Sequence, residues 1–253
     1  MNYDLIVLIC FHENKECLLD QILNIKKFNG KNVAIIVSNG SNENLDAIKT
    51  QTSVFVIDRK QQMSERFGTI IPLHLELFDF IKEFEITATH ILLLASNQLF
   101  VRHGFYGFMK QFDFGYCGRE VPDTNYFGFW LENPSNPTFN KLMEKIGAEF
   151  FTLQSNHDGM FFKFNIFKDM IEYFEPYRNT CEPHHHEEFM YISYLNKFYD
   201  KSNAVEFSSY NCFNMVDLDE ERVKNAINSN QFIVKRIPRD INNPTRIYIR
   251  NLS

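Results

Sequence analysis

Apolar runs of four to six residues alternate with amphipathic stretches along the first hundred residues of the chain. The runs that we predict to be buried strands are residues 5–10, 33–37, 54–57 and 91–95. Leucine and isoleucine recur at helical spacing after the first run, and a strongly amphipathic helix is predicted over residues 72–84. Strands that alternate with helices predict an α/β fold with a mostly parallel central sheet, flanked by helices.

The second half of the chain has a less regular pattern. Strands are predicted near residues 115–120, 127–130 and 160–164, and helices over 138–151, 166–174 and 187–199. No internal repeat, low-complexity stretch or linker divides the chain. We therefore predict a single domain over residues 1–253.

The composition is that of a folded protein. Of the 253 residues, 44% are hydrophobic and 23% are charged, which is ordinary for a globular domain and excludes disorder. The 26 Lys and Arg are outnumbered by 32 Asp and Glu, so the formal net charge is −6. Nucleic-acid binding needs a broad basic face, and we therefore expect no nucleic acid among the partners.

Cysteine usage and the N-terminus predict the compartment. The five cysteines are scattered and odd in number, which favours reduced thiols in a cytosolic protein. Asp4 stands where a signal peptide needs positive charge, and no apolar run reaches the roughly 18 residues of a membrane span. We expect a cytoplasmic protein with at most peripheral contact at the inner face of the membrane.

Ligands of parallel sheets bind at the carboxyl ends of the strands. The loops that follow the predicted strands are residues 11–14, 38–42, 58–60 and 96–98. The last of these, Ser96, Asn97 and Gln98, carries no carboxylate, so a hard cation would find no ligand there.

A group of cations closes the chain. Lys235, Arg236 and Arg239 follow an apolar triplet, and Arg246 and Arg250 come soon after. Three cations so close together can neutralise a compact anion such as a diphosphate. The alternative is a solvated basic tail, because short charge runs usually face water.

The loop 182–188, which enters the last predicted helix of the second half, holds three histidines and three glutamates. One interpretation is a metal site, although neighbouring side chains on an extended chain point in opposite directions. A second is that Glu187 is a general base at a helix start. A third is that Glu187 and Glu188 only complement the helix dipole.

Two further polar pairs are candidates. His157 and Asp158 lie in a polar loop before a predicted strand, a pattern that also fits a simple turn. Arg119 and Glu120 also fit an exposed ion pair of little energetic value.

In their order and spacing, several motifs resemble those of the core-2/I-branching β-1,6-N-acetylglucosaminyltransferases, a family that includes the peptide O-xylosyltransferases. The segments that carry the resemblance are residues 56–68, 91–100, 156–162, 183–192 and 232–236. Phe67 replaces a family Trp, Asn97 replaces an Asp, and a His triplet precedes Glu187. These departures indicate a distant, bacterial relative.

The resemblance implies a GT-A-type fold and an inverting, metal-independent transfer of GlcNAc or a similar sugar from a UDP-sugar. No cofactor is expected. The acceptor would be a glycan or a lipid-linked glycan of a bacterial surface polysaccharide. Residues 1–100 would then form the nucleotide-binding half, 101–230 the acceptor and catalytic half, and 231–253 the diphosphate-binding segment.

The same match implies roles for single residues. Glu187 would be the catalytic base, with Glu188 in its place if the alignment shifts by one. The diphosphate would be bound by Lys235, Arg236 and Arg239. The acceptor would be bound by Asp158, His157, Arg119, Glu120 and Trp130, with Tyr126 beside it, although core packing is an alternative for either aromatic ring. The nucleotide would be bound by Phe11, His12, Ser38, Asn39, Asp58, Arg59, Ser96 and Asn97.

Two other functions stay open. The replaced Trp and Asp would suit a non-catalytic protein that binds a nucleotide-sugar or glycan on the same fold. A metallohydrolase that uses the histidines at 184–186 would instead hold a stoichiometric metal.

Overall fold

The structure, a computed structural model, describes most of the chain. The described residues are 1–58, 70–120, 141, 144–150, 153–178, 187–207, 209–212 and 216–252.

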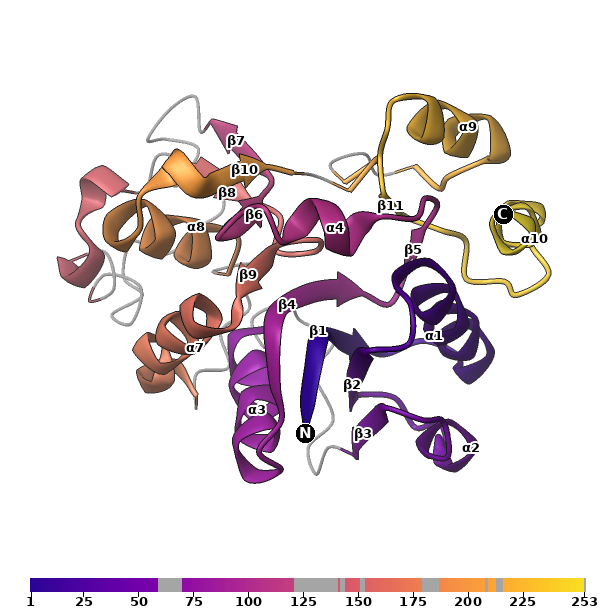
Figure 1. Cartoon of the computed structure of the whole chain (residues 1–253), viewed down its shortest axis with the longest axis horizontal. Coiled ribbons are helices and arrows are strands. Elements are labelled where there is room, and N and C mark those ends of the chain that lie inside the picture. Colours follow the sequence, from indigo (N-terminus) through magenta and orange to yellow (C-terminus); the bar gives the residue numbers. More distant parts are fainter. Residues whose placement is uncertain are drawn as a thin grey trace.

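The centre of the molecule is a seven-stranded sheet in the order β10-β6-β9-β4-β1-β2-β3 (Figure 1). Its strands are β1 (Asn2–Phe11), β2 (Val33–Asn39), β3 (Val54–Asp58), β4 (Thr87–Ala95), β6 (Phe114–Tyr116), β9 (Phe161–Lys163) and β10 (Ala204–Glu206). β1 pairs in parallel with β2 and β4, whereas β9 is antiparallel to β4 and β6. The predicted α/β fold with a mostly parallel sheet is confirmed.

Alternate residues of β1 enter two separate cores, as the pleat of a strand requires. Ile6 and Leu8 pack in one core with helices α3 (Ile70–Glu83), α7 (Phe164–Tyr173) and α8 (Glu187–Phe198). Leu5, Val7 and Ile9 pack in the other with α1 (Lys15–Asn29), α2 (Asp46–Lys49) and α4 (Phe105–Met109). Helices therefore cover both faces, which explains why the central strands are apolar throughout.

Three-residue strands and the C-terminal helices are the elements that the sequence pattern missed. They are β5 (Gln98–Phe100), β8 (Leu153–Ser155), β10, β11 (Ile233–Lys235), α9 (Glu220–Asn228) and α10 (Pro244–Asn251), with 3-10 turns at Glu175–Tyr177 and Lys201–Asn203. Two further short elements, β7 (Gly118–Glu120) and a 3-10 turn at Ala148–Phe150, lie within segments predicted as strand and helix. The predicted strand at 115–120 is two strands in separate sheets, β6 and β7. The predicted strand at 127–130 lies outside the described residues.

Besides its apolar face, helix α1 carries a row of polar side chains that bind distant parts of the chain. Asn14 caps the helix by accepting from the Cys17 amide at 2.8 Å. The buried side chains of Gln21 and Asn24 donate to backbone carbonyls at the end of β4 and in β5, at 2.7–2.8 Å. Spacings of three and four residues place this row on one side of the helix.

The C-terminal helix α10 is attached to the same row. Arg246, which is completely buried, meets Asp20 at 2.8 Å, and Arg250 meets the other oxygen of Asp20 at 2.9 Å. Arg246 also donates to the carbonyl of Pro238 at 2.5 Å. A buried charge needs such partners, because an unpaired one would be costly.

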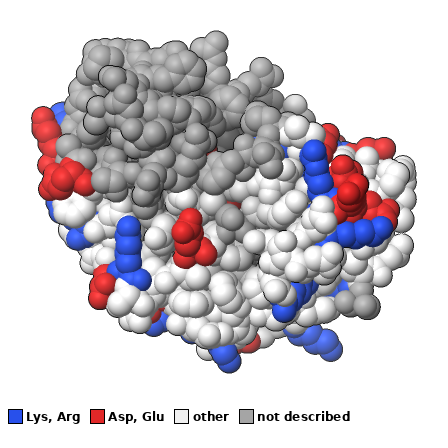
Figure 2. All heavy atoms as spheres, turned by 90° about the horizontal axis from the view of Figure 1, so that it is seen from above, with Lys and Arg blue, Asp and Glu red and all other residues white. Residues whose placement is uncertain are grey.

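Within the described residues, no helix is long and apolar enough to cross a membrane. On the face shown in Figure 2, Lys and Arg side chains lie next to Asp and Glu side chains at several places.

We expect Asp20→Asn to destabilise the protein by about 3–5 kcal/mol, because it leaves the buried Arg246 guanidinium without its carboxylate. Urea unfolding at pH 7 measures the change. The matched control is Asp46→Asn, whose carboxylate is 75% exposed and pairs with Lys49; it should cost less than about 1 kcal/mol. Equal costs for the two variants would contradict the role given to the buried pair.

Candidate functional site

The order of the strands places a topological switch point between β1 and β4. The chain runs from β1 to β2 and β3 on one side, and then returns to β4 on the other side of β1. Ligands of open α/β sheets bind in the crevice outside the carboxyl ends of the strands at such a point. Here those ends lead into residues 12–14 and 96–97.

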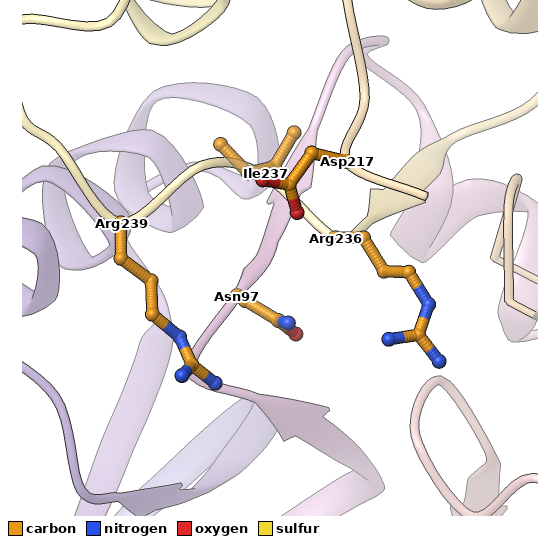
Figure 3. A pocket seen from close by; sticks show the side chains of 5 residues that line it. All are labelled: Asn97, Asp217, Arg236, Ile237 and Arg239. Carbon is orange, nitrogen blue, oxygen red and sulfur yellow. The ribbon is translucent and has the colours of Figure 1, made fainter. Parts of the chain in front are cut away.

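A hollow of about 310 Å³ lies at this place and includes Asn97. Its lining residues are Asn97, Asp217, Arg236, Ile237 and Arg239. Figure 3 shows the side chains of Arg236 and Arg239 extending in the same direction on either side of Asn97. Two guanidinium groups that flank one hollow are suited to bind the oxygens of a phosphate or carboxylate.

The backbone is irregular at Arg236, which lines the hollow. Lys235 is paired with Gln98 of β5, and the next ladder bond runs from the amide of Ile237 to the carbonyl of Asn97, at 3.1 Å. Arg236 is thus an extra residue between two paired ones, and its φ of 66° is left-handed. Bulges of this kind re-aim a side chain next to functional sites, and for a non-glycine residue the conformation costs about 1–2 kcal/mol.

Arg239 is held by the loop that follows β1. Its carbonyl accepts from the side chains of Asn14 at 2.9 Å and Cys17 at 3.2 Å. Its Nε donates to Oε1 of Glu13 at 2.8 Å, and the Ser96 hydroxyl donates to the same oxygen at 2.8 Å. Glu13 binds through Nε, so this contact leaves the two terminal nitrogens of the guanidinium for a ligand, and the side chain is 58% exposed.

Glu13, which supports the hollow through Arg239, is a residue that the sequence interpretation missed. Its side chain is only 2% exposed, and it joins a strand-end loop to the C-terminal segment 226 residues away. The loop 11–14 follows a predicted strand, and a carboxylate at such a strand end is a signal of a site residue. Nothing local indicated that its partner would be Arg239.

Lys235 points away from the hollow and into a buried polar cluster. Its side chain is 9% exposed, forms an ion pair with Asp158 and donates to Oδ1 of Asn156 at 3.3 Å. The second oxygen of Asp158 lies 3.1 Å from Nε2 of His157. A predicted diphosphate-binding residue and two predicted acceptor-binding residues therefore bind one another.

In this cluster, charged partners shift the pKa values of Asp158 and Lys235 more than burial does. Burial alone would raise the pKa of Asp158, but His157 and Lys235 together hold that pKa well below its usual range. Burial would likewise lower the pKa of Lys235, and the Asp158 carboxylate raises it instead. Both groups are charged at neutral pH. The roles predicted for them in binding sugar or diphosphate stay predictions.

The cluster continues toward helix α8. The ring of His157 lies 6.0 Å from that of His74, whose Nδ1 is 2.7 Å from the hydroxyl of Tyr191 in α8. Burial lowers the pKa of His74 to about 3, so this histidine is neutral at pH 7. Glu187 begins α8 one helical turn before Tyr191, and its side chain lies outside the description.

Most of the other strand-end residues pack in the core or bind residues of neighbouring strand-end loops. Phe11 is core, with 1% exposure, and His12 is exposed. Ser38 and Asn39 are buried at the end of β2, where Asn39 donates to Asp58 at 3.1 Å. Lys49 lies 2.6 Å from Asp58 and, with Asn39, lowers the pKa of that carboxyl. Nucleotide binding by these residues stays a prediction.

The remaining predicted site residues lie in β7 or outside the described residues. Arg119 and Glu120 lie in β7, which pairs with β8, and their side chains are outside the description. Also outside the described residues are Arg59, Tyr126, Trp130 and the histidines at 184–186. Among the residues that are described, no three His, Cys, Asp or Glu side chains are arranged to hold a metal ion.

We expect Lys235→Met to destabilise the protein at pH 7 by about 3–5 kcal/mol, because the Asp158 carboxylate stays buried without its main cation. The lowered pKa of Asp158 means that its stabilisation is present above the unfolded-state pKa of about 3.9 and is lost as pH falls below it. Urea unfolding should therefore show that, between pH 7 and pH 3, the free energy of unfolding falls less in the variant than in the wild type. The control is Lys224→Met, which removes an exposed ion pair with Glu220. If the free energy of unfolding of Lys235→Met fell as much between pH 7 and pH 3 as that of the wild type, the prediction would be contradicted.

Comparisons with known proteins assign no family to this site. No protein-family model matches the chain, and no curated protein is similar enough to count as a relative. Its function is therefore inferred from the residues and contacts of the site.

Proposed function

We propose that this protein is an inverting glycosyltransferase of the GT-A type. It moves GlcNAc or a similar sugar from a UDP-sugar to a glycan or lipid-linked glycan acceptor in the cytoplasm. The observation that carries the proposal is the pair of arginines, Arg236 and Arg239, that lines one hollow at the switch point of the sheet. The sequence motifs that resemble a transferase family supply the reaction type.

The chemistry of the hollow fits a departing nucleoside diphosphate. As the bond between the sugar and the diphosphate breaks, the bonding electrons go to the diphosphate and its negative charge increases. Preorganised donors stabilise such a charge most, and each guanidinium offers several N–H groups in a fixed plane. In this proposal Arg236 and Arg239 supply the positive charge that a divalent metal supplies in other transferases.

The role that we propose for Lys235 differs from the diphosphate binding that the family resemblance implied. Its ammonium is buried against Asp158, so its charge is already compensated. We assign it to holding β11 against the loop 156–158, which fixes the backbone from which Arg236 projects. The diphosphate contacts then fall to the two arginines.

Glu187 is the proposed base. It would take the proton from the acceptor hydroxyl as the acceptor oxygen attacks the anomeric carbon from the side opposite the diphosphate. Its position at the first residue of α8 favours the ionised carboxylate, because a helix N-terminus stabilises negative charge. The contacts from Tyr191 through His74 and His157 connect α8 to Asp158 and Lys235, and hence to the strand that ends at Arg236.

A non-catalytic protein that binds a nucleotide-sugar is the second candidate. Glu13 already compensates one of the two arginines of the hollow, which would limit the charge available to a leaving group. Such a protein would bind UDP in the same hollow without transferring or hydrolysing any donor.

Binding of UDP should raise the melting temperature of the wild-type protein in the presence of EDTA. Arg239→Ala should weaken binding by about 1.5–3 kcal/mol, because a charged hydrogen-bond donor is lost. Arg236→Gly should do the same without unfolding the protein, since glycine tolerates the left-handed conformation. The same measurement with GDP, CMP and dTDP shows which nucleobase the site prefers. Lys31→Ala, which removes an exposed charge elsewhere, is the control. An equal UDP shift in wild type and both arginine variants would refute the assignment.

Glu187→Gln should lower sugar transfer by about 10²–10⁴-fold and leave UDP affinity unchanged, because only proton transfer is lost. Release of UDP from a UDP-sugar, with and without acceptor, measures turnover. Glu188→Gln is the matched control and should retain activity. Full activity in Glu187→Gln would remove this residue as the base, and activity that disappears with EDTA would contradict the metal-independent mechanism.

A further inference from the structure

The hollow also contains a carboxylate, and its presence bears on which phosphate ligand fits. Asp217 lines the same space as Arg236 and Arg239. Figure 3 shows its carboxylate next to Ile237, with Asn97 and then the two guanidinium groups farther along the hollow. No resemblance or motif had pointed to this residue.

The backbone holds Asp217 firmly in place. The amide of Leu218 donates to the carbonyl of Arg236 at 2.9 Å, so the two segments run side by side. Arg222 donates to the carbonyl of Asp217 at 3.3 Å, and Asn211 donates to that of Val216 at 2.9 Å. The backbone of Asp217 is therefore fixed beside Arg236, and its exposed side chain lines the hollow.

The charges around the hollow are balanced. Arg236 and Arg239 contribute two positive charges, Asp217 contributes one negative charge, and Glu13 behind Arg239 contributes another. A sugar-linked diphosphate carries about two negative charges and a free triphosphate about four, since a terminal phosphate adds close to two. A site that served only polyphosphate would gain nothing from a carboxylate, because like charges brought together reduce affinity.

A carboxylate beside two arginines is instead suited to a ligand that joins phosphates to hydroxyl groups. An ionised carboxylate only accepts hydrogen bonds, and sugar hydroxyls donate them. Hydrogen bonds to a charged group are among the stronger ones in proteins. The same group both attracts the sugar and repels a further phosphate, so it discriminates in two ways.

Resting on the proposed transferase function, we propose that Asp217 selects sugar-linked nucleoside diphosphates over nucleoside triphosphates. Its carboxylate accepts hydrogen bonds from hydroxyls of the donor sugar and repels a third phosphate at the same position. Arg236 and Arg239 bind the two phosphates that both ligands share. The residue determines specificity and takes no part in bond making or breaking.

Isothermal titration calorimetry with UDP, UDP-GlcNAc and UTP, all in EDTA, tests this proposal on the full chain. Asp217→Asn keeps the shape of the side chain and removes its charge. The ratio of UTP affinity to UDP-GlcNAc affinity should rise about tenfold in this variant, which corresponds to ~1.4 kcal/mol. Glu221→Gln, an equal change of charge at an exposed position of α9, should leave the ratio unchanged. Thermal melting of each variant shows that it is folded.

The outcomes separate the two proposals. An affinity ratio that is the same in wild type and Asp217→Asn, while UDP still binds, would overturn the role of Asp217 and leave the transferase proposal standing. An equal rise in Glu221→Gln would also overturn it, since general electrostatics would then explain the change. If wild type bound none of the three nucleotides, the proposed function would fall, and the role of Asp217 with it.

Discussion

The ion pair between Asp20 and Arg246 joins the C-terminal helix to α1 in a place that water does not reach. Around it, the side chains of Asn14, Cys17, Gln21 and Asn24 bind backbone carbonyls at the end of β4, in β5 and at Arg239. One helix thus fixes both the strand end and the C-terminal segment. The hollow lies where these two meet, so its geometry depends on this buried polar row. Such contacts are costly to break one partner at a time, which makes the arrangement rigid.

The C-terminal cations have three different fates. Arg246 and Arg250 bind Asp20, and Lys235 binds Asp158. Arg236 and Arg239 line the hollow, where Arg239 is also paired with Glu13. A run of positive residues in a sequence therefore does not become one positive surface. Burial and pairing divide it: Lys235 is buried against Asp158, whereas Arg236 and Arg239 line the hollow.

Charge compensation gives the site its proposed selectivity. A hollow with uncompensated arginines would attract any polyphosphate, whereas one with carboxylates at fixed places favours a ligand of limited charge that also carries hydroxyls. The buried cluster from Lys235 to Tyr191 adds a mechanical connection between the diphosphate side and helix α8. The two halves of the proposed reaction would then be positioned by one set of contacts.

The sequence by itself determined the α/β class and the long strands, because β1, β2 and β4 are apolar on both faces and their helices are amphipathic. It also indicated the strand-end loops and the basic segment. These supply Asn97, Arg236 and Arg239, which line the hollow. Tertiary structure decided the rest. The partnership of Glu13 with Arg239, the burial of Lys235 and the entry of Asp217 into the hollow join residues far apart in the chain. Three-residue strands such as β5 and β11 are too short to show a periodicity in the sequence. They pair with each other, and side chains of α1 bind the backbone of β5.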